Sequence, residues 1–142
     1  MKRIILIMIV LIAGLSVHAQ GFEVEFTVNK ERTVAIYKVK NNTEFVLALM
    51  KGPSASPDSM KSYCEVYYKS GNGKIFSSIL EVIPYPKVLI PIASRQSYLY
   101  KVDLTPFKDK HIVKLEGCFH LIVRKTVKDF ETKRIIKSID LP

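Results

Sequence analysis

Two cysteines are the side chains of this sequence best suited to covalent chemistry. Cys64 and Cys118 are the only cysteines in the chain, and both fall in segments with the residue pattern of strands. If the chain is exported, it reaches an oxidising compartment, where a disulfide between them would stabilise the fold by roughly 4 kcal/mol. The alternative is a pair of buried free thiols that pack as small apolar residues. We predict the disulfide.

No metal site, cofactor or catalytic group is predicted. A structural zinc site needs four ligands that include close cysteine or histidine pairs, and the sequence has no such pair. Ser97, His120 and Asp103 are the types of residue found in a hydrolase triad, but the sharp Gly-x-Ser-x-Gly turn of a nucleophile is missing. Cys118 and His120 should share one strand face because of their spacing. We interpret His120 as an ordinary strand residue and the protein as a non-enzyme; a hydrolase would need His111 or His120 beside a nucleophile in a cleft.

The elements that would position these residues are strands, because alternation with period two dominates the sequence. It begins at Phe22-Glu23-Val24-Glu25-Phe26-Thr27-Val28, where Glu23 and Glu25 share a face that we expect to be solvated. Turn residues at Asn41-Asn42 and at Ser70-Gly71-Asn72-Gly73 separate such segments. We predict strands at 22–28, 33–40, 45–50, 62–69, 74–82, 88–91, 96–104, 117–123 and 133–141, with one helical turn at 106–110. The fold class is therefore an all-β, antiparallel β-sandwich of seven to nine strands.

Two short phrases of the sequence carry a resemblance. Val39-Lys40-Asn41-Asn42-Thr43 is similar to a valine-x-asparagine-asparagine strand end, and Leu115-Glu116-Gly117-Cys118-Phe119-His120-Leu121 is similar to a leucine-x-x-glycine-x-aromatic opening of a penultimate strand. Both resemble immunoglobulin-like domains of exported bacterial proteins. The chain has no tryptophan, so it lacks the Cys-Trp-Cys core of antibody domains. The resemblance implies an immunoglobulin-like fold and no particular activity, because this architecture has many functions.

The N-terminal residues predict export. Lys2 and Arg3 precede an apolar run from Ile4 to Leu15, and the small residues Val17 and Ala19 follow it. This pattern is typical of a signal peptide, and the run is shorter than the roughly 20 residues that span a bilayer. An uncleaved anchor helix is the alternative. We predict a signal peptide at 1–19, one domain at 20–142, and a periplasmic or secreted location.

Net charge narrows the choice of partner. The chain has 22 Lys and Arg residues against 13 Asp and Glu residues, and removal of Lys2 and Arg3 would leave 20 against 13, a net charge of +7. Such a surface attracts acidic proteins, anionic glycans and lipid headgroups, whereas nucleic acid is not an expected partner of an exported protein. No apolar run after Gln20 is long enough to cross a membrane, so we predict no transmembrane segment in the mature chain.

The predicted function is an exported, non-catalytic binding module that acts through protein–protein contacts, as an inhibitor, immunity factor or accessory protein. The candidate sites are a breaker-rich loop and the tip of the Gly-containing hairpin. Their partner-binding residues are Pro53, Pro57, Asp58, Asn72 and Lys74. Tyrosines also suit recognition because they offer wide contact at low entropy cost, although many of them must fill the core. These are Tyr63, Tyr67, Tyr68, Tyr85, Tyr98 and Tyr100.

The alternative function is an envelope domain that binds anionic glycan or lipid headgroups. Its candidate anion-binding residues crowd the predicted C-terminal hairpin: Arg124, Lys125, Lys133, Arg134 and Lys137. Lysines on an edge strand also prevent edge-to-edge aggregation, which is a structural reason for the same residues.

Overall fold

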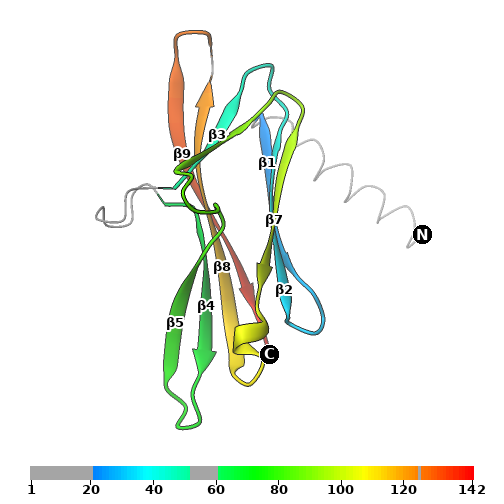
Figure 1. Cartoon of the computed structure of the whole chain (residues 1–142), viewed down its shortest axis with the longest axis vertical. Helices are drawn as coiled ribbons and strands as arrows, with labels where there is room; N and C mark the ends of the chain where they lie inside the picture. The colour runs from blue at the N-terminus through cyan, green and yellow to red at the C-terminus, as the bar shows by residue number, and fades with distance from the viewer. Residues whose placement is uncertain (1–20, 52–60, 125) are drawn as a thin grey trace, which may run out of the picture.

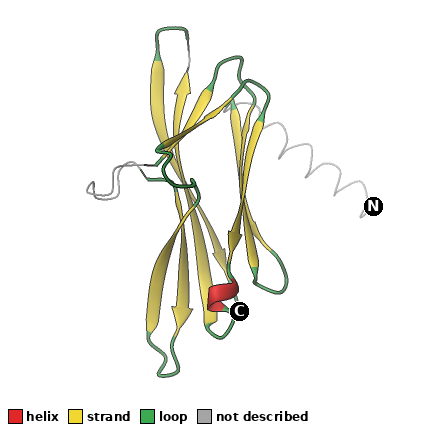
Figure 2. Ribbon diagram, viewed as in Figure 1, coloured by secondary structure: helices red, strands yellow, loops and turns green. Residues whose placement is uncertain are grey.

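The computed structural model describes residues 21–51, 61–124 and 126–142, which form nine strands and one short 3-10 turn (Figures 1 and 2). The all-β class predicted from the sequence is confirmed, and the predicted helical turn appears as the 3-10 turn Thr105–Phe107. The last hairpin differs most, since its first strand begins at His111 rather than at Gly117. The strands are β1 (Phe22–Val28), β2 (Val34–Asn41), β3 (Leu47–Met50), β4 (Tyr63–Lys69), β5 (Ile75–Glu81), β6 (Leu89–Ile92), β7 (Ser97–Asp103), β8 (His111–Arg124) and β9 (Phe130–Asp140).

The strands form two antiparallel sheets. The small sheet has the order β1-β2-β7. In the large sheet, β8 is flanked by β9 on one side, while β4 and β3 pair with successive parts of its other side. β5 then adds to β4, and β6 adds to β3. One side of the large sheet therefore ends in β5 and β6, and the other ends in β9.

The two sheets pack face to face around one core (Figure 1). Tyr37 of β2 stacks on Phe119 of β8 with ring centroids 4.0 Å apart, and the Tyr37 hydroxyl donates to the Cys118 carbonyl at 2.7 Å. The Phe26 ring lies so close to Gly117 that a Cβ at this position would come within 2.8 Å of it. This two-layer arrangement is consistent with the predicted β-sandwich.

The turn after β2 is held by a buried asparagine side chain. Asn41 Nδ2 donates to the carbonyls of Phe45 at 2.7 Å and Ile92 at 2.9 Å. Its Oδ1 accepts from Thr43 N at 2.9 Å and from the Thr43 hydroxyl at 2.6 Å. The turn therefore depends on side-chain hydrogen bonds that connect the end of β2 to β6 of the large sheet.

The first strand behaves as its alternation predicts. Phe22 and Phe26 are buried, whereas Glu23 lies opposite Lys40 and Glu25 opposite Lys38 in the β1–β2 pair. The two carboxylates therefore lie on a face with opposite charges across the strand, as expected for a solvated face.

The predicted disulfide between Cys64 and Cys118 is absent, and both residues are buried free cysteines. The β4–β8 register gives the reason, because Cys64 lies opposite Gly117 while Cys118 lies opposite Tyr63. Directly opposed residues share a sheet face and successive residues alternate, so the two thiols point to opposite faces. Cys64 belongs to the hydrophobic core, whereas Cys118 Sγ contacts the Lys61 carbonyl at 3.4 Å. The alternative of two buried thiols is the correct one.

Several predicted features lie outside the described residues. These are the signal peptide at 1–19, the loop residues Pro53, Pro57 and Asp58, and Lys125. Among the residues that are described, the structure contains no helix that is both long enough and apolar enough to cross a membrane.

Candidate functional site

Exposed apolar side chains gather on the side of the large sheet that ends in β5 and β6. The described residues include eleven large hydrophobic side chains that are exposed, and six of them belong to the segment from β5 to the start of β6. Exposed apolar side chains that lie near one another are candidates for contact with a partner. These six are Ile75, Phe76, Ile79, Tyr85, Val88 and Leu89.

The loop between β5 and β6 presents the most exposed of these side chains. We call residues 84–88 the Tyr85 loop. Tyr85 is 86% exposed and Val88 is 66% exposed. Tyr85 lies between two prolines, and the Tyr85–Pro86 bond is cis.

The Tyr85 loop is attached firmly at both ends. Val82 and Ile83, which precede it, are fully buried. Lys87 N donates to the Pro84 carbonyl at 3.0 Å and closes a turn, and Lys51 N donates to the Val88 carbonyl at 2.8 Å. Because both ends are held, the loop can present an aromatic side chain at a small cost in conformational entropy.

A groove of about 220 Å³ lies where β5 leads into the Tyr85 loop. Its charged wall includes Lys51, whose Nζ lies 2.9 Å from a carboxylate oxygen of Glu81. Its apolar wall includes Ile79, which is 64% exposed. The groove therefore extends the apolar surface from β5 toward the loop.

The β4–β5 hairpin tip contains the two predicted partner-binding residues that the structure describes. Asn72 and Lys74 are exposed, and the Asn72 side chain accepts from the Ser70 hydroxyl and from Lys74 N. A second groove of about 380 Å³ lies beside this tip, and Tyr68 and Phe76 form part of its lining. The tip is thus exposed and held by side-chain hydrogen bonds, and its binding of a partner stays a prediction.

No protein-family model matches this chain, and no curated protein matches its sequence. We therefore infer its function from the geometry of its surfaces.

The predicted anion-binding residues are divided between two faces of the C-terminal hairpin. Lys133 and Lys137 lie opposite Leu121 and Gly117 in the β8–β9 register, so they are on the face toward the small sheet. Arg134 lies opposite His120, and Arg124 opposite Phe130, which puts both arginines on the outer face.

Two of these basic residues already have partners. Lys133 Nζ lies 3.4 Å from a Glu131 carboxylate oxygen. The Arg134 guanidinium donates to Cys118 Sγ and to the Tyr63 hydroxyl, both at 3.5 Å. The described members of this set are therefore not brought together as one anion site.

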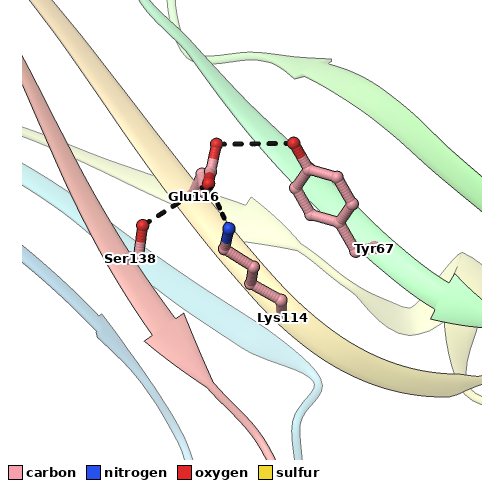
Figure 3. Close-up of polar contacts among 4 residues, drawn as sticks. All are labelled: Tyr67, Lys114, Glu116 and Ser138. Atoms are coloured by element: carbon pink, nitrogen blue, oxygen red, sulfur yellow. Dashed lines mark hydrogen bonds and ion pairs between the residues drawn. The ribbon is translucent and has the colours of Figure 1, made fainter.

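A polar cluster crosses the outer face of the large sheet (Figure 3). Glu116 accepts from the Tyr67 hydroxyl at 3.4 Å and from the Ser138 hydroxyl at 3.5 Å, and its carboxylate lies 2.5 Å from Lys114 Nζ. Glu116 raises the pKa of Lys114. Burial, together with the carboxylates of Glu65 and Glu116, raises the pKa of Tyr67. The phenol and the ammonium thus keep their protons at neutral pH, and the cluster connects β4, β8 and β9.

The structure does not assemble the triad considered from the sequence. Ser97 and Asp103 lie at opposite ends of β7 in the small sheet, whereas His120 lies on the outward face of β8. His120 is 5% exposed, and neither of its ring nitrogens has a hydrogen-bond partner. Burial and the nearby Arg134 lower its pKa. Among the described residues, no three His, Cys, Asp or Glu side chains are grouped as metal ligands.

Sequence reasoning missed the prominence of Tyr85 and the apolar character of β5. In the sequence, Tyr85 is one of six tyrosines suited to recognition, and its flanking prolines indicate only a break in strand pairing. The useful feature was the combination, because an aromatic residue between two prolines in a loop has few ways to become buried. For β5, the feature was a strand with no charge before Glu81.

Proposed function

We propose that this chain is an exported, non-catalytic binding module that contacts a protein partner through the Tyr85 loop. Export is supported by the N-terminal Lys2, Arg3 and apolar run, which precede the described residues. The immunoglobulin-like type is part of the proposal, and it is supported by the separation of β1-β2-β7 from a sheet in which the last two strands, β8 and β9, are neighbours.

The observation that carries this proposal is the 86% exposure of Tyr85 in a loop whose two ends are buried or hydrogen-bonded. Tyrosine is enriched among the residues that dominate binding energy at protein interfaces. A loop that is already held in place loses little entropy on binding, which is the geometry used by many protein inhibitors. The neighbouring Val88 and the groove beside Ile79 provide apolar surface around this anchor.

The proposal is tested by quantitative capture from a periplasmic extract of the source cells, followed by calorimetry with the purified partner. Tyr85→Ala should weaken binding at least tenfold, because truncation of a central aromatic anchor commonly costs about 2 kcal/mol or more. Val127→Ala is the matched control, since Val127 is 75% exposed in the distant β8–β9 turn. Failure to capture a stoichiometric partner, or equal binding by the Tyr85→Ala variant, would refute the proposal.

The anion-binding alternative has less support. Its described residues are divided between two faces, and Lys133 and Arg134 already have partners. Charge reversal at Lys133, Arg134 and Lys137 separates the two functions. Loss of envelope association at low salt in this variant would favour the alternative, whereas unchanged association would remove it.

A further inference from the structure

β5 is a terminal strand of the large sheet, and its outer edge has free hydrogen-bonding groups. Ser70 N donates to the Lys74 carbonyl at 2.8 Å, so Ser70 and Lys74 are a hydrogen-bonded pair. The β4–β5 register continues directly from this pair. Because such pairs alternate in an antiparallel ladder, residues 76, 78 and 80 bond to β4. The N–H and C=O groups of Ile75, Ser77, Ile79 and Glu81 therefore point away from β4. No other strand of the described residues pairs with this edge.

The side chains of β5 leave this edge unprotected. Natural edge strands commonly carry charges, prolines or bulges that prevent pairing with another chain. β5 reads Ile-Phe-Ser-Ser-Ile-Leu-Glu and has no charge before its last residue, Glu81. Ile75 and Ile79 are 59% and 64% exposed, and their spacing places both on the outer face of the sheet.

We propose that β5 pairs antiparallel with β5 of a second copy of this chain, about a two-fold axis through Ser77. A symmetric antiparallel pair keeps the same sheet face outward in both copies. A residue whose side chain points outward in one copy therefore lies opposite a residue whose side chain points outward in the other. The free edge groups then fit two simple registers, centred on Ser77 or on Ser78. This inference goes beyond the proposed function, because its contacts are made by β5 rather than by the Tyr85 loop; the two surfaces meet at Ile79, which also lines the groove beside that loop.

The exposed isoleucines decide between these registers. With the axis at Ser77, Ile75 of each copy lies opposite the partner's Ile79, and four isoleucine side chains form one apolar patch on the outer face. Apolar pairs of this kind stabilise a sheet, whereas an apolar residue opposite a charge does not. With the axis at Ser78, Ile75 would lie opposite the partner's Glu81. The Ser77 register therefore buries the apolar surface that is otherwise exposed.

Charge also favours a second copy as the occupant. The hairpin end of β5 is basic, with Lys69 and Lys74 next to the tip, while the opposite end of β5 carries Glu81. Antiparallel pairing sets Lys74 at the tip of each copy beside the Glu81 end of the other, where the Glu81 side chain is 61% exposed although Lys51 Nζ lies 2.9 Å from it. It also keeps the two basic tips at opposite ends of the interface, where they repel least.

The first experiment is sedimentation equilibrium of the mature protein from micromolar to millimolar concentration. The wild type should form a dimer, and Ile79→Lys should weaken the dimer by at least tenfold. Its circular dichroism should stay unchanged, and its thermal midpoint should equal that of the wild type at a dilution where both are monomeric. Ile136→Lys is the matched control, because Ile136 is also an exposed isoleucine, 47% exposed on β9, and this variant should dimerise normally. A wild-type protein that stays monomeric, or a dimer that Ile79→Lys leaves intact, overturns the proposal.

The second experiment measures the register with two neighbouring serines. Ser77→Cys should form a disulfide-linked dimer under mild oxidation at least tenfold faster than Ser78→Cys, since only residue 77 meets itself across the axis. The native cysteines are both buried, and the wild type supplies the background rate. Faster cross-linking of Ser78→Cys would overturn the Ser77 axis. Tyr85→Ala should stay dimeric, so failure of the dimer and failure of the Tyr85 contact are separate results.

Discussion

β5 and β9 are outer strands on opposite sides of the large sheet, and they differ in charge. β9 carries Lys133, Arg134 and Lys137 together with acidic residues at both ends, whereas β5 carries only Glu81. Charges along an edge disfavour pairing with another strand because pairing would desolvate them. The β9 edge is therefore protected by its own charges, whereas the β5 edge lacks this protection and is suited to being covered.

Both edges depend on β8, the strand between them. β8 pairs with β4, which carries β5, and it pairs with β9 along most of its length. At Gly117 the chain has no side chain, and the Phe26 ring of the small sheet fills the space. A change at Gly117 should therefore disturb both edges together, whereas a change on one edge should leave the other intact.

The largest expected effect is that of Gly117→Ala. The added Cβ would lie 2.8 Å from the Phe26 ring, so the ring or the strand must shift, and overpacking of this kind costs about 1–3 kcal/mol. The free energy of unfolding in urea measures it. Gly71→Ala is the matched control, because nothing lies within 4 Å of a Cβ at that position, and its effect should stay within about 0.5 kcal/mol. Equal effects of the two substitutions would contradict this account of β8.

Much of the fold was predictable because alternation and turn chemistry act locally. The bounds of β1 match the predicted strand, and the β4–β5 hairpin follows from its Gly-Asn-Gly turn. β8 was predicted too short, because Lys114 and Glu116 interrupt the apolar pattern of its first half. The structure places these two side chains on the outer face, where they form an ion pair.

The features that were not predictable depend on register and on contacts between distant segments. Cys64 and Cys118 both fall in strands, but a shift of one residue decides whether their thiols can meet. Asn41 looked like an ordinary turn residue, while in the structure it hydrogen-bonds to Ile92, which is distant in the sequence. Which of six tyrosines remains exposed also depends on what covers each ring, and composition cannot reveal this.

A smaller effect is expected from removing the charges that protect β9. In the Ile79→Lys background, which lacks the β5 contact, Lys133→Thr combined with Lys137→Thr should produce new concentration-dependent association. The physical reason is that an edge strand without lysines can pair with another chain. Sedimentation velocity in low salt measures it, and Lys108→Thr combined with Lys110→Thr is the control for an equal loss of charge outside the edges. A triple variant that stays monomeric would show that charge is not what protects β9.

The smallest expected effect is a change of folding stability with pH that arises at His120, on the β9 side of the large sheet. His120 lies opposite Arg134, and burial, followed by this guanidinium, lowers the pKa of the imidazole. The unfolded chain, whose histidine has a pKa of about 6.5, therefore binds a proton before the folded chain does as pH falls. The stabilisation from neutral His120 is complete above that pKa and is lost as pH falls below it toward the lower pKa of the folded state.

Urea unfolding at mildly alkaline and mildly acidic pH measures this loss. The wild type should lose stability on acidification by less than Gly117→Ala costs, and His120→Gln should reduce the loss. His111→Gln is the matched control, since His111 is exposed at the start of the same strand, and this variant should keep the wild-type pH dependence. Dimerisation through β5 should hardly change over the same range, because no histidine lies on that strand. If His120→Gln keeps the wild-type pH dependence, other groups cause that dependence. His120 is then not part of what distinguishes the β9 edge from the β5 edge.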